Sequence, residues 1–172
     1  MPPLTWAYIH TAINHFPVVL TTIGALTAIF AAIRGKRGIW LYTMATLTLA
    51  GLSVYPVYLS GNEADEFLRD PWYIKSGVID AHNDAANFAL AFVLVTGVIA
   101  AYAWWRALRY RDEPIPRAIR TFVLLGALSS LATVARTAYL GGKIIHEAPV
   151  LQLPTPPAGL PPGVVAKPGQ ED

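Results

Sequence analysis

The histidines are the residues of this chain whose type and spacing could do chemistry. His10 and His15 stand near the start of a long apolar segment, with Pro17 directly after them. His82 stands at the start of another apolar segment, and His146 follows the last one. Imidazole is costly on a lipid-facing surface, and it is a common ligand of metals and of haem iron. The pattern therefore predicts a binding site between helices, close to one face of a membrane.

The segments that must position these histidines have the length and composition of membrane-spanning helices. Of the 172 residues, 54% are hydrophobic and only 14% are charged, whereas a typical soluble domain has about a quarter charged residues. Residues 16–33, 38–61 and 85–105 contain no Asp, Glu, Lys or Arg, and residues 121–142 contain only Arg136. Each run is close to the ~20 residues that cross a ~30 Å hydrocarbon layer. We expect an all-α fold, a four-helix transmembrane bundle over residues 1–147.

Proline and glycine suggest where the helices bend and end. The first helix should cover residues 5–33 and bend at Pro17, which removes a backbone hydrogen bond. The next three should cover about 39–59, 81–105 and 117–140, because Ser60-Gly61 and Gly141-Gly142 resemble helix ends. Residues 62–80 are polar, and we expect a short extracytoplasmic helix and loop there. Residues 148–172 are rich in proline and should form an extended extracytoplasmic tail.

The basic residues predict the orientation of the bundle. The loops after the first and third helices hold eight of the thirteen Lys and Arg residues. By the positive-inside rule these loops face the cytoplasm, and both termini lie on the extracytoplasmic side, as in a bacterial inner membrane. All four histidines then gather near the extracytoplasmic face.

Depth along the helices indicates how the histidines pair. At ~1.5 Å per residue, His15, His82 and Arg136 lie near one depth, and His10 lies about 7.5 Å further out. His10 and His15 are about 140° apart around their helix, so we expect them to serve different sites. His15 and His82 are then the expected axial ligands of a haem b, with Arg136 neutralising its propionates. His10 and His146 are the candidate ligands of a second, outer haem.

Other roles are open for the same residues. His15 and His82 could be hydrogen-bonded interior residues without a cofactor, and His10 could belong to an interfacial aromatic belt. Arg136 could instead extend its charge to the membrane surface. The chain has no cysteine, which excludes disulfides, thiolate-bound clusters and covalent c-type haem and disfavours a soft-metal site.

The run His10-Thr-Ala-Ile-Asn-His15-Phe16-Pro17 resembles the opening of a family of small four-helix bacterial membrane proteins of unknown function. The likeness covers residues 6–147 and includes Ser60-Gly61, His82 and Gly141-Gly142. Some members of the family are fused to Rieske-type iron–sulfur domains, which implies a redox setting and haem ligation by the histidines. The family's last segment has an aromatic residue and then a histidine two positions later, where this chain has His146 and Ala148. The resemblance therefore does not carry a ligand role to His146.

Taken together, the sequence predicts a membrane-bound b-type cytochrome with one or two haems. It would exchange electrons between quinol or another membrane donor and an extracytoplasmic redox protein, as a subunit of a larger membrane complex. We expect an electron-transfer protein rather than an enzyme by itself, with the lipid bilayer as its surroundings and no nucleic-acid partner. The alternative is a cofactor-free accessory subunit that scaffolds a membrane assembly.

Overall fold

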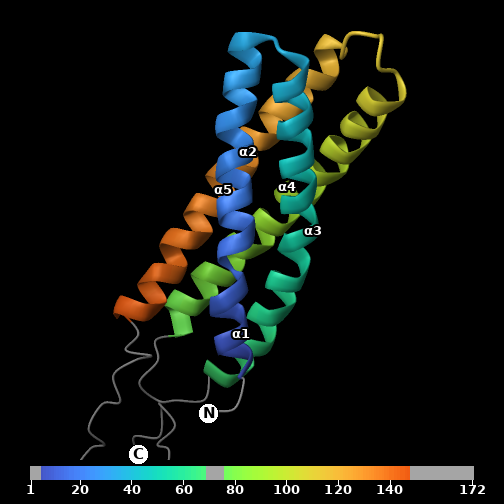
Figure 1. Ribbon diagram of the computed structural model, residues 1–172. Coiled ribbons are helices and arrows are strands. Elements are labelled where there is room, and N and C mark those ends of the chain that lie inside the picture. The colour runs from blue at the N-terminus through green and yellow to red at the C-terminus, as the bar shows by residue number, and fades with distance from the viewer. Residues whose placement is uncertain (1–4, 69–75, 148–172) are drawn as a thin grey trace, which may run out of the picture.

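The computed structural model describes residues 5–68 and 76–147, and those residues form an all-α bundle (Figure 1). The helices are α1 (Trp6–Ile13), α2 (His15–Arg34), α3 (Arg37–Leu68), α4 (Ser76–Arg109) and α5 (Arg117–Glu147). Four spans, α1 with α2 and each of α3, α4 and α5, are long and apolar enough to cross a membrane. The predicted four-helix fold is confirmed. The expected Pro-rich tail, residues 148–172, lies outside the described residues.

The first span is interrupted at Asn14, as the position of Pro17 predicts. Pro17 has no N–H to donate to the carbonyl of Ile13, and α1 ends at that residue. Asn14 keeps helical angles, φ −62° and ψ −21°, so α2 continues from α1 with little change of direction (Figure 1). The span ends at Gly35, whose φ of 65° lets the chain turn back into α3.

The later helices extend further than the sequence pattern indicates. Helix α3 runs through Gly61 to Leu68, α5 runs through Gly141 to Glu147, and α4 begins at Ser76. Within the described ranges only Gly35 among the glycines has a positive φ. Gly61 and Gly141 therefore do not end helices, and the stretch connecting α3 to α4 is shorter than the expected 62–80.

The bundle packs small residues inside and turns large apolar side chains outward. Many of the fully buried positions on three of the spans are alanines, namely Ala25, Ala28, Ala31, Ala100 and Ala127, although Trp40 and Met44 of α3 are buried as well. Large side chains on the outer faces are more than half exposed, among them Leu26, Leu52, Val98 and Phe122. This distribution suits a bilayer, where burying leucine between helices gains little over leaving it in lipid, and close backbone packing holds helices together.

Helix α4 is fixed against both of its neighbours by small and hydroxyl side chains. A Cβ built on Gly51 of α3 would lie 2.8 Å from the Cα of Gly97 in α4, so only glycine permits this crossing. On the other side, Ser130 of α5 donates to the Phe92 carbonyl at 3.2 Å or to Thr96 Oγ1 at 2.9 Å. These contacts hold the helix that carries His82.

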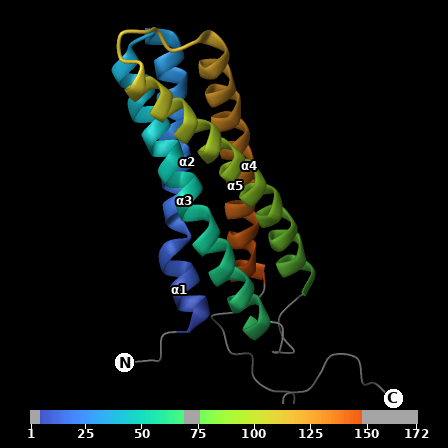
Figure 2. The same cartoon turned by 90° about the vertical axis from the view of Figure 1, so that its right-hand side faces the viewer.

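The bundle has two chemically different ends, which Figures 1 and 2 show from two sides. The turn at 35–36 and the loop 110–116 lie at one end, which we call the loop end. The start of α1, the end of α3, the start of α4 and the end of α5 lie at the other, the histidine end. Helices α2 and α4 each pack against both α3 and α5, so the first span and α4 face each other diagonally.

We predict that Gly51→Ala destabilises the bundle by about 1–3 kcal/mol, because the new methyl group meets backbone that cannot move aside. Thermal unfolding in detergent, followed by circular dichroism, measures the loss. Gly38→Ala is the matched control, since it lies in the same helix and a Cβ there meets nothing within 4 Å. Equal melting temperatures for Gly51→Ala and the parent protein would contradict the prediction.

Candidate functional site

The ring of His10 is anchored on helix α3. Its Nδ1 lies 3.1 Å from the carbonyl oxygen of Val57 and 3.1 Å from Ser60 Oγ. Ser60 Oγ donates to the same carbonyl at 2.7 Å. Since a carbonyl can only accept, this contact favours the tautomer with the proton on Nδ1 and a lone pair on Nε2.

His82 is anchored on helix α5 in the same way. Its Nδ1 lies 3.0 Å from the carbonyl oxygen of Thr137. The ring is partly buried, like that of His10. Among the described residues, Nε2 of neither ring has a hydrogen-bond partner, so both rings offer the nitrogen that binds metals.

A glycine one helical turn beyond each carbonyl makes the anchor possible. A Cβ built on Gly61 would lie 3.0 Å from Cε1 of His10, and one on Gly141 would lie 3.1 Å from Cε1 of His82. In an α-helix the Cα–Cβ bond tilts toward the N-terminus. A side chain at position i+4 therefore shields the carbonyl at i. Glycine at 61 and 141 uncovers the carbonyls of Val57 and Thr137, so that an imidazole from another helix can reach them.

The two anchors form a repeat within the bundle. In each, a histidine near the start of one span contacts a carbonyl four residues before a glycine near the end of the next span. The sequence does not display this repeat plainly, because the histidine-to-glycine separation is 51 residues in the first half and 59 in the second. One signal could have revealed the repeat. Each histidine near the start of a span has a counterpart glycine near the end of the next span, and that glycine lies inside its helix.

The two anchored histidines belong to one polar region at the histidine end. His10 and Asp65 are both near enough to His82 to act on it electrostatically. Asp65 also accepts a hydrogen bond from Asn83 Nδ2 at 2.9 Å. Tyr58 donates to Asn87 Oδ1 at 2.7 Å, which adds a second side-chain link between α3 and α4.

The other candidate residues from the sequence lie differently. His15 begins α2 and is exposed, as is its neighbour Phe16, so it does not share the anchored arrangement of His10 and His82. Arg136 is exposed on α5 and lines a small cavity of about 190 Å³ with Ala85, Phe88 and Thr133. His146 lies in the last turn of α5, with its side chain outside the described part, so its pairing with His10 stays a prediction.

The side chains available as ligands at the histidine end limit which metal or cofactor could bind there. Over residues 5–68 and 76–147, no group of three or more His, Asp, Glu or Cys side chains could hold a metal ion. Structural zinc sites take four protein ligands and catalytic sites three. Bis-histidine haem takes two imidazoles as axial ligands, and two imidazoles anchored through Nδ1 are what this end of the bundle offers. In ligand type and number the residues present therefore fit a haem.

Comparison of the chain with protein-family models, with curated proteins and with solved structures finds no match. The functional assignment therefore depends on the geometry of the site.

We predict that each glycine controls one histidine. Gly61→Ala should displace the ring of His10 alone, and Gly141→Ala that of His82 alone, because each methyl group would press on one Cε1. The ¹⁵N chemical shifts of the histidine rings, recorded by NMR in micelles, report the Nδ1–H tautomer and its hydrogen bond.

Gly142→Ala is the control for this experiment, since a Cβ at this neighbouring position meets nothing within 4 Å. The anchors are refuted if Gly142→Ala alters the ring of His82 as strongly as Gly141→Ala does.

Proposed function

We propose that this protein is a membrane-bound b-type cytochrome, an electron-transfer protein in which His10 and His82 are the axial ligands of a haem. The observation that carries the proposal is the pair of imidazoles on diagonally opposed spans, each with its Nδ1 held by a backbone carbonyl of the next helix. Histidines that bind a metal almost always donate their other ring N–H to a carbonyl, carboxylate or water, which fixes the tautomer and raises ligand basicity. Both histidines meet that condition through Val57 and Thr137.

The pairing differs from the one that depth along the helices suggested. That count favoured His15 with His82, but His15 is exposed and its ring makes no hydrogen bond to a described residue, whereas the ring of His10 is anchored. With His10 and His82 used, a second haem would need His146 and His15 as its histidine ligands, and the geometry supports one haem more directly than two.

The surrounding residues have defined roles in this proposal. Haem supplies reversible one-electron chemistry, and the chain must hold it, orient the two rings and balance its charge. Gly61 and Gly141 set the ring positions, since any side chain there would displace them. Arg136 directly precedes Thr137 in α5 and lines a small cavity with Ala85, Phe88 and Thr133, which supports its proposed role as the partner of a propionate.

The proposed setting follows from where the site lies. The positive-inside rule would place the histidine end on the extracytoplasmic side of a bacterial inner membrane. A haem there would exchange electrons with an extracytoplasmic redox protein or a larger membrane complex, and quinol is a suitable donor in the bilayer. One haem at this end gives no route across the ~30 Å hydrocarbon layer.

One observation favours a second candidate function. The same anchors join α1 to α3 and α4 to α5, which is what purely structural histidines would do in a cofactor-free scaffold subunit. The cytochrome and the scaffold differ in whether Nε2 of His10 and His82 binds haem iron.

Optical spectra of the purified protein distinguish the cytochrome from the cofactor-free scaffold. The protein is expressed with 5-aminolevulinate so that haem supply is not limiting, and reduced-minus-oxidised spectra are recorded. We expect Soret and α-band changes that His10→Ala and His82→Ala abolish, since each removes an axial ligand. His15→Ala is the matched control and should keep its haem, because its ring is outside the anchored pair.

A fold defect is distinguished from ligand loss by chemical rescue. Added imidazole should restore the spectrum of His82→Gly, because free imidazole can occupy the ligand position, whereas it cannot repair a collapsed bundle. A parent protein that inserts fully into membranes and shows no haem spectrum would rule out the cytochrome and leave the scaffold.

A further inference from the structure

Toward the loop end, helix α4 presents an exposed stripe that changes from apolar to aromatic to basic. The stripe consists of Val95, Val98, Tyr102, Trp105 and Arg109. These residues follow one another at spacings of three and four, so they share one face of the helix. All five are exposed, and the side chains of the first four are more than half exposed. We call this face the α4 stripe.

The depths along the α4 stripe match the layers of one membrane leaflet. At ~1.5 Å per residue, Trp105 lies about 6 Å from Arg109 along the helix axis, and Val95 lies about 21 Å from it. The headgroup layer on each side of the ~30 Å hydrocarbon core is roughly 5–7 Å thick. The rings of Tyr102 and Trp105, whose centres are 6.1 Å apart, are typical of the edge of that core. Arg109 then lies at the level of the lipid phosphates.

Two arginines share one aromatic ring at the basic end of the stripe. The guanidinium carbon of Arg106 lies 5.3 Å from the ring centre of Tyr110, and that of Arg109 lies 5.7 Å from it. Two positive charges are thus held close together, and they repel each other. An anion that contacts both guanidinium groups would offset this repulsion.

Arg109 is the arginine of this pair whose charge has no partner within the described chain. Arg106 is paired with Glu113 at 3.2 Å, and the nearby Arg111 donates from Nε to the carbonyl of Leu108 at 3.3 Å. In the part of the chain that the structure describes, Arg109 makes no hydrogen bond and no ion pair. Its guanidinium is therefore available to a group outside the chain.

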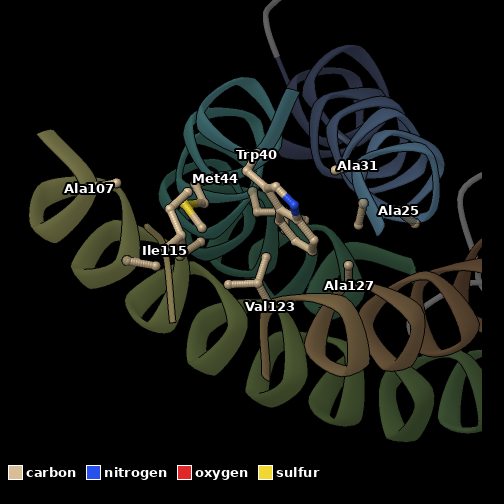
Figure 3. Close-up of a cluster of buried hydrophobic side chains, with 12 residues drawn as sticks. Ala25, Ala31, Trp40, Met44, Ala107, Ile115, Val123 and Ala127 are labelled. Carbon is tan, nitrogen blue, oxygen red and sulfur yellow. The ribbon is translucent and has the colours of Figure 1, made fainter. Parts of the chain in front are cut away.

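The backbone that carries Tyr110 is held in place by Arg37 of α3. The guanidinium of Arg37 donates to the carbonyls of Ala107, Tyr110 and Glu113. Ala107 itself is buried in the apolar cluster that Figure 3 shows. The end of α4 is therefore fixed on its inner side, and a ligand on its outer side would meet a recognition surface that is already ordered.

We propose that the α4 stripe binds one anionic phospholipid, with an acyl chain along Val95 and Val98 and the phosphate between Arg106 and Arg109. Arginine suits this role, because its planar guanidinium can donate two parallel hydrogen bonds to phosphate oxygens. The order of apolar, aromatic and basic residues matches the order of acyl chain, glycerol and phosphate in a lipid. This match favours a lipid over a soluble phosphate or an acidic protein. The site is independent of the proposed haem.

The test measures lipid binding to the full chain by native mass spectrometry, after purification in an uncharged detergent. Dioleoyl phosphatidylglycerol and dioleoyl phosphatidylcholine, which have the same acyl chains but differ in net charge, are titrated separately. The first phosphatidylglycerol should bind at least about fivefold more tightly than the first phosphatidylcholine, because only its headgroup leaves the phosphate charge uncompensated. Equal affinities for the two lipids would overturn the proposal.

A matched pair of variants locates the site. Arg109→Gln should weaken phosphatidylglycerol binding about fivefold or more, the effect of one lost charge-assisted hydrogen bond. Arg34→Gln removes the same charge at the same end of the bundle, from an exposed residue that also lies over an aromatic ring, that of Phe30 at 5.8 Å. It should leave the affinity unchanged. If Arg34→Gln weakens binding as much as Arg109→Gln, the preference comes from total charge and the proposed site is wrong.

A headgroup without acyl chains tests the apolar part of the stripe. Glycerophosphoglycerol at the same concentration as phosphatidylglycerol should not displace the lipid, because it cannot contact Val95 or Val98. Displacement at equal concentration would assign the site to a soluble phosphate and overturn the lipid assignment.

Discussion

The contact on which the histidine end depends is between an imidazole and a backbone carbonyl inside a helix. Such a carbonyl already accepts the N–H four residues on and is normally covered by the side chain at that position. Glycine at that position leaves a lone pair within reach of another helix. Gly61 and Gly141 do this for Val57 and Thr137, and His10 and His82 use the result. The tautomer, depth and direction of both rings follow from one backbone feature used twice.

The sequence predicts the number of spans well, because that number depends on long apolar runs. These runs can be read from the sequence whatever the details of side-chain packing. The sequence also predicts the interruption beside Pro17, because proline has no N–H to donate to the carbonyl of Ile13 four residues earlier. The helix ends at the histidine end were predicted less well. Gly61 and Gly141 have the composition of terminators, and only the neighbouring helix reveals that they are contact positions.

The choice between His10 and His15 shows the limit of counting residues. A residue count along a span gives depth but not the side of the helix on which a residue lies. The direction of a ring depends on how its helix is rotated in the bundle, and the ring of His10 reaches α3 whereas His15 is exposed.

Each half of the chain supplies one anchored imidazole and the helix that holds it. The first hairpin contains His10 with its carbonyl on α3, and the second contains His82 with its carbonyl on α5. A nascent chain that has inserted only its first hairpin therefore presents His10, already anchored on α3, without His82. Any group that requires both rings can be captured only after the second hairpin has docked on the first through Gly97 and Gly51, so loading would report that membrane assembly of the whole bundle is complete.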